Sequence, residues 1–138
     1  MNYLPWALAA MVTYGIASFA VKVVFRTIHP SLGLTVVNLF VVLAGVGWIA
    51  ITGPTAFRNV GWNVDTVRML AAGIILAIAI VTFYKGLSLG PTSIVVPIFA
   101  LSFTISAVLG LTLLDEPIKA TRIAGLVLAA VAVVLLAR

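Results

Sequence analysis

Cysteine is absent from this 138-residue chain, and only three of its residues are acidic. Without cysteine there can be no disulfide, iron–sulfur cluster or thiolate zinc site. The single histidine, His29, has no partner at metal-ligand spacing, so we expect no metal and no other cofactor. Charged residues make up 8% of the chain and hydrophobic residues 64%, whereas soluble domains carry roughly 25% charged residues. The composition therefore predicts an integral membrane protein.

The net charge of +5 does not indicate a nucleic-acid partner. The lysines and arginines occur singly near the ends of apolar stretches, where they can anchor to lipid headgroups. The chain has no basic run and no fold motif of a nucleic-acid binder. The partners we expect are therefore the lipid bilayer, a small-molecule substrate and a second copy of the chain or a related half, with no nucleic acid.

Long apolar stretches fill most of the chain, and each is close to the length of about 20 residues that a helix needs to cross a bilayer. Because unpaired strands cannot cross lipid, these stretches are expected to be helices. We predict an all-α, multi-pass integral protein of the cell (inner, cytoplasmic) membrane, with residues 1–138 as one membrane domain. Its five transmembrane helices are expected at about 4–25, 32–52, 67–87, 92–114 and 118–137.

Little sequence remains for a soluble catalytic domain, since the longest connection covers only residues 55–66. No catalytic constellation lies within a span, so we do not expect an enzyme. No aspartate or glutamate falls inside a span either. An embedded carboxylate is the usual device for exchanging protons against a cationic drug, so its absence argues against that mechanism.

Five spans would place the two termini on opposite sides of the membrane. The eight basic residues divide equally between the two sides, which leaves the orientation undecided, because cations normally mark the cytoplasmic side. Dual insertion as an inverted homodimer is one consequence. If Lys22 or Lys85 lies inside its helix, the count instead favours a cytoplasmic N-terminus. The side of the N-terminus carries Arg58, Arg68, Lys119 and Arg122, and the other side Lys22, Arg26, Lys85 and Arg138.

A polar stripe marks the first helix, where Tyr14, Ser18, Lys22 and Arg26 recur every four residues and so share one face. Such a face is expected to line a bundle interior or a cavity. Lys22 has two interpretations. It can bind an anion or carboxylate within the span, or its long side chain can reach the headgroups from the end of the helix.

Four further residues are candidates for the lining of a substrate cavity: Asn38 in the second span, Lys85 in the third, and Ser93 and Pro97 in the fourth. A lysine at such a position is more often an interfacial anchor, which is the alternative interpretation of Lys85. Pro97 removes one backbone hydrogen bond and frees the carbonyl of Ser93 for another partner.

Other positions indicate packing and capping. Small residues at every fourth position of the fourth span favour close helix contact, and Gly125 has a similar character in the fifth. Acidic residues followed by proline are typical of a helix start. The small residues are Ser102, Ser106 and Gly110, and the capping residues are Asp115, Glu116 and Pro117.

Several of these segments resemble one known pattern. Tyr84 to Pro91, Val96-Pro97-Ile98, Leu114 to Pro117 and Gly125 follow one another as in the EamA-type repeat of the drug/metabolite transporter superfamily. Tyr14-Gly15 is similar to the start of that repeat, with tyrosine in place of its usual tryptophan. Gly86 and Asp115 also depart from the common residues.

The resemblance implies a transporter. Typical members contain two such repeats in opposite orientation, whereas this chain carries one, so we expect it to work as a dimer. Its function would then be to move a small metabolite or drug by alternating access, as an antiparallel or a parallel dimer. The alternatives are a non-transporting membrane scaffold or accessory subunit, and a lipid-carrier flippase.

Overall fold

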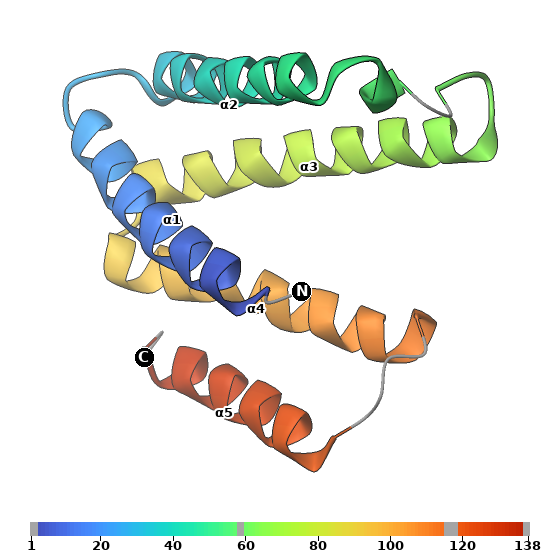
Figure 1. Ribbon diagram of the computed structural model, residues 1–138. Helices are drawn as coiled ribbons and strands as arrows, with labels where there is room; N and C mark the ends of the chain where they lie inside the picture. The colour runs from blue at the N-terminus through green and yellow to red at the C-terminus, as the bar shows by residue number, and fades with distance from the viewer. Residues whose placement is uncertain (1–2, 58–59, 115–118, 137–138) are drawn as a thin grey trace. The chain divides into compact units, whose positions relative to one another are not determined.

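The computed structural model describes residues 3–57, 60–114 and 119–136. Within these ranges the chain forms helices and no strand (Figure 1). The elements are α1 (Leu4–Val24), α2 (Pro30–Thr52), the 3₁₀ helix η1 (Gly53–Phe57), α3 (Val64–Leu89), α4 (Thr92–Leu113) and α5 (Ala120–Leu136).

The predicted all-α membrane architecture is confirmed for this part of the chain. The helices α1, α2, α3 and α4 are long and apolar enough to cross a membrane, and α5 is a shorter apolar helix of 17 residues. At 1.5 Å per residue α5 spans about 26 Å, somewhat less than the hydrocarbon core of about 30 Å. Of the residues expected at the ends of this fifth span, 118 and 137 lie outside the described ranges, and Lys119 precedes the helix.

Local capping explains where α2 and α3 begin. Pro30 occupies the first turn of α2, and the side chain of His29 accepts a hydrogen bond from the Ser31 amide at 3.3 Å. Asn63 caps α3, because its Oδ1 accepts the Thr66 amide at 2.8 Å. The α3 helix therefore starts three residues before its expected position, at Val64 rather than 67.

The chain folds as two compact units. Unit 1 consists of Met1–Phe19 and Leu89–Arg138, and unit 2 of Ala20–Ser88. In unit 1, α4 and α5 pack against each other. In unit 2, Lys22 in the last turn of α1 contacts the end of α3, and Phe25 in the following turn contacts α2 at Gly33 and α3 at Tyr84.

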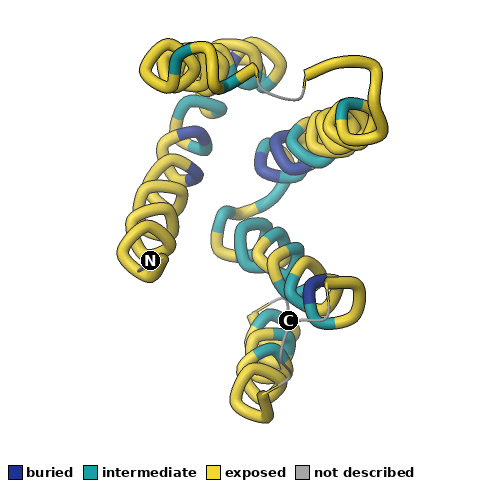
Figure 2. The backbone as a smooth tube through the Cα atoms, turned by 45° about the vertical axis from the view of Figure 1, so that its right-hand side comes forward, coloured by how far each residue is buried: buried dark blue, intermediate teal, exposed yellow. Residues whose placement is uncertain are grey.

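The core of unit 2 is small and lies at these helix ends. Val21, Phe83, Tyr84 and Leu87 are buried, and Leu87 is fully inaccessible. Figure 2 shows in dark blue how few positions along the described chain are buried. The ring of Phe25 lies 5.4 Å from that of Tyr84, which in turn meets Phe83 edge-on at 6.0 Å. An aromatic cluster thus fixes the end of α3 against the turn that follows α1.

Gly33 allows α2 to join this cluster. The residue is buried, and a Cβ atom built on it would lie 2.7 Å from Cε1 of Phe25. Any larger residue at this position would force the Phe25 ring to shift, because the ring lies directly against the backbone of α2. The requirement for glycine here is one of space, since the backbone is ordinary helix.

Candidate functional sites: the Lys22 contact and the α2/α3 groove

Lys22 lies in the last turn of α1 and reaches the end of α3. Its Nζ donates a hydrogen bond of 2.6 Å to the backbone carbonyl of Leu87. That carbonyl is one of the last four of α3, which have no partner within their own helix. A cation is also favoured at the negative end of a helix dipole. Lys22 therefore caps α3, a role that neither interpretation of its sequence position included.

The polar stripe of the first span keeps its helical spacing only as far as Lys22. The α1 helix ends at Val24, so Arg26 lies in the following turn and is exposed. Ser18 is buried, and its hydroxyl donates to the Tyr14 carbonyl at 2.8 Å. Tyr14 and Ser18 belong to unit 1, whereas Lys22 belongs to unit 2.

Tyr14 takes part in an aromatic row within unit 1. Its ring stacks on Phe99 of α4 with 6.1 Å between the ring centroids and 12° between the planes. Phe99 in turn meets Phe103 edge-on at 6.1 Å. Because Tyr14 and Phe103 are exposed, the row presents aromatic surface along α1 and α4.

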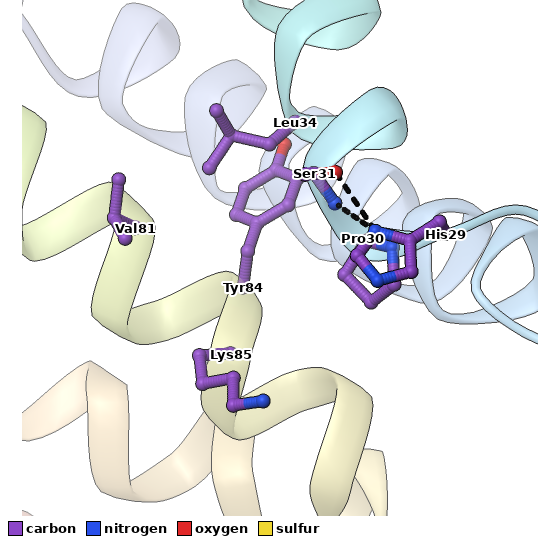
Figure 3. A pocket seen from close by; sticks show the side chains of 7 residues that line it. All are labelled: His29, Pro30, Ser31, Leu34, Val81, Tyr84 and Lys85. Atoms are coloured by element: carbon purple, nitrogen blue, oxygen red, sulfur yellow. Dashed lines mark hydrogen bonds between the residues drawn. The ribbon is translucent and has the colours of Figure 1, made fainter.

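Two cavities follow the seam between α2 and α3 in unit 2. The first, of about 360 Å³, is lined by His29 to Ser31, Leu34, Val81, Tyr84 and Lys85 (Figure 3). The second, of about 300 Å³, is lined by Asn38, Gly73 and Ala77 among others. Leu34 and Val81 line both cavities. We call the two together the α2/α3 groove.

The groove brings together two of the predicted candidates, Asn38 and Lys85. The Asn38 side chain donates to the Leu34 carbonyl at 2.8 Å and is hydrogen-bonded to the side chain of Tyr84. The exposed Lys85 lies one position beyond Tyr84, at the His29 end of the groove. The groove thus has the cation of Lys85 at one end, and between its apolar walls it has the side-chain amide of Asn38, which is already hydrogen-bonded.

The remaining candidates lie on α4 and α5 in unit 1. Ser93 is exposed in the first turn of α4, and Pro97 is half-buried within a helix that continues past it. The Ser106 hydroxyl bonds the Ser102 carbonyl at 3.1 Å, and Gly110 is buried. Gly125 is exposed and lines a cavity of about 330 Å³ with α4 residues. The predicted motif residues Glu116 and Pro117 lie outside the described residues.

Four structurally important residues were not among the predicted sites: Phe25, Gly33, Asn63 and Tyr84. Asn63 could have been found, because asparagine just before an apolar helical run is a typical N-cap. The contacts of Phe25 and Gly33 carry no such local signal. The part of the chain that the structure describes contains no group of three or more histidine, cysteine or acidic residues that could hold a metal ion.

Comparison with known proteins identifies one family. The model of the EamA-like transporter family matches residues 1–138, and no curated protein and no solved structure matches the chain. The family match agrees with the resemblance of the sequence segments and with the apolar, membrane-length helices. Members of this family are transporters rather than enzymes. The chain is therefore a multi-pass membrane protein that belongs to the EamA-like transporter family.

Proposed function

We propose that this protein is a secondary transporter subunit that moves a small metabolite or drug across the membrane. Two five-helix repeats would form an antiparallel homodimer and work by alternating access. The observation that carries the proposal is the family match over residues 1–138, which spans one repeat of five helices.

The need for a second copy follows from how little each unit encloses. Between 0% and 11% of the apolar window of each membrane-length helix is buried. A substrate path must be shielded from lipid, and a single repeat has few side chains with which to enclose one. Pairing with an inverted copy would supply the missing walls. Lys22 lies in the last turn of α1 and Lys85 within α3, so the count of basic residues favours a cytoplasmic N-terminus, and the inverted copy is the insertion that the topology experiment must detect.

We assign the lining of the path to Tyr14, Ser18 and Lys22 of α1 and to Ser93 and Pro97 of α4. The aromatic row through Tyr14 offers a stacking surface, and the freed carbonyl of Ser93 offers a polar contact. Lys22 supplies positive charge, which favours a substrate with a carboxylate or phosphate. Pro97 provides a point at which α4 can bend.

A transport assay tests this lining. In proteoliposomes that accumulate a labelled carboxylate or phosphate metabolite, Tyr14→Leu should lower the initial rate about tenfold, equivalent to about 1.4 kcal/mol. The matched control is Trp6→Leu, which removes an exposed aromatic from the same helix. Equal rates for wild type and Tyr14→Leu with every accepted substrate would exclude Tyr14 from the path.

Topology tests the antiparallel pair. Since the chain has no cysteine, Thr27→Cys and Thr55→Cys each give one exposed labelling site, in the first and second connections. Dual insertion should let an impermeant maleimide label about half of each variant in intact cells. Labelling of one variant only means a single orientation and rules out the antiparallel homodimer.

The same assays separate transport from the alternatives. A scaffold or accessory subunit would show no substrate accumulation in proteoliposomes that contain this chain alone. A lipid-carrier flippase would move a lipid-linked substrate between leaflets and would leave water-soluble metabolites outside.

A further inference from the structure

We propose that the α2/α3 groove is a binding site for an anionic phospholipid of the surrounding bilayer. The lipid phosphate would lie at Lys85, and one acyl chain would follow the seam from Tyr84 to Gly73. The proposed lipid site uses none of the residues assigned to the substrate path.

The length of the groove suits one acyl chain. Its two cavities are adjacent, since Leu34 and Val81 line both. From Lys85 to Gly73 the groove follows α3 for about 18 Å at 1.5 Å per residue. One leaflet contributes about half of the 30 Å hydrocarbon core. An acyl chain that starts at headgroup depth would therefore run nearly the full length of the groove.

Small residues on α3 keep the groove open. A Cβ atom built on Gly73 would meet nothing within 4 Å, and Ala77 follows one turn later on the same wall. Leu76 and Val81 are 61% and 53% exposed, so apolar surface is available to a lipid chain. Cavities of about 300 and 360 Å³ are large enough for a chain of methylenes.

The polar groups of the groove are arranged for an amphiphile. The Asn38 side chain is already hydrogen-bonded to the Leu34 carbonyl and to Tyr84. An acyl chain that covers Asn38 therefore does not deprive its amide group of hydrogen-bond partners. The exposed Lys85 lies near the end of α3, at the depth of the headgroups for a helix that spans the bilayer. His29 is hydrogen-bonded to Ser31, and none of the described residues that line the two cavities is acidic. The charge at this end therefore favours an anion.

Lipid binding to the purified chain tests the site. The protein in neutral detergent is titrated with phosphatidylglycerol or phosphatidylcholine, and bound lipids are counted by native mass spectrometry. Wild type should retain phosphatidylglycerol preferentially. Lys85→Gln should weaken its binding about fivefold, the factor equivalent to about 1 kcal/mol per cation at a membrane surface. The control Lys119→Gln makes the same charge change at an exposed position outside the groove.

A second pair of variants tests the acyl-chain half. Gly73→Leu should fill the groove and abolish the preference for phosphatidylglycerol over phosphatidylcholine. Gly45→Leu is the matched control and should leave that preference unchanged, since both glycines have open space at Cβ. Ala77→Leu repeats the test should Gly73→Leu fail to fold. A phosphatidylglycerol carrying a diazirine on its acyl chain should cross-link to residues 73–81 in the wild type.

Three results would overturn the site. The first is equal binding of the two lipids by the wild type. The second is an equal loss of phosphatidylglycerol binding in Lys85→Gln and Lys119→Gln, because the lipid would then be attracted by the net charge of the protein and not by a specific site. The third is dissociation of a dimer by Gly73→Leu with lipid binding unchanged, because the groove would then be filled by a second copy.

Discussion

Replacing Lys22 with methionine should lower the free energy of unfolding by about 2 kcal/mol and abolish transport. The substitution keeps an unbranched side chain but removes the donor to the Leu87 carbonyl. Hydrogen bonds that involve a charged group contribute about 1.5–3 kcal/mol. Leu87 is fully buried, so water cannot replace the lost donor at low cost. Thermal and denaturant unfolding in micelles, followed by circular dichroism, measures the change.

Two further variants identify the cause of this loss. Lys22→Arg retains a cationic donor and should recover part of the stability. Lys119→Met removes an exposed lysine and should leave the free energy of unfolding unchanged. If Lys22→Met and wild type unfold at the same temperature and denaturant concentration, the hydrogen bond from Lys22 to the Leu87 carbonyl does not stabilise the protein. Lys22 would then have a role in substrate binding alone.

Gly33→Val should destabilise unit 2 by about 3 kcal/mol, the upper part of the range for overpacked cores. The new Cβ would lie 2.7 Å from Cε1 of Phe25. The ring of Tyr84 lies 5.4 Å from that of Phe25 between centroids, which limits how far the Phe25 ring can move. The same unfolding measurement in micelles reports the effect.

A double substitution tests whether the clash with Phe25 is the reason. Phe25→Ala removes the obstructing ring, so the combined Gly33→Val and Phe25→Ala variant should be more stable than the sum of the two single effects predicts. Gly45→Val is the matched control, since nothing lies within 4 Å of a Cβ at that glycine. Strict additivity of the pair would show that Phe25 does not set the requirement for glycine.

The helical architecture was predictable because lipid restricts what a chain of this composition can form. A bilayer satisfies no backbone hydrogen bonds, so apolar stretches of about 20 residues become helices almost regardless of their detail. Helix ends were less predictable, since they depend on single side chains. Asn63, for example, starts α3 three residues before its expected position.

The sites were predictable only in part. The sequence singled out Lys22, Asn38 and Lys85, because polar groups inside apolar spans are costly and require an explanation. It could not identify their partners. Lys22 bonds a carbonyl 65 residues away, and any residue can offer a carbonyl, so no sequence pattern marks the acceptor. Asn38 and Lys85 lie along one groove only because α2 and α3 are neighbours.

The sequence by itself therefore determined that this chain is a membrane-embedded helical repeat and which polar residues its spans contain. These properties depend on composition and on the length of each apolar stretch. The tertiary structure alone decided that Lys22 caps α3, that Gly33 must leave room for Phe25, and that small residues on α3 leave a groove open. Each of these depends on a distance between helices, and side-chain packing sets that distance.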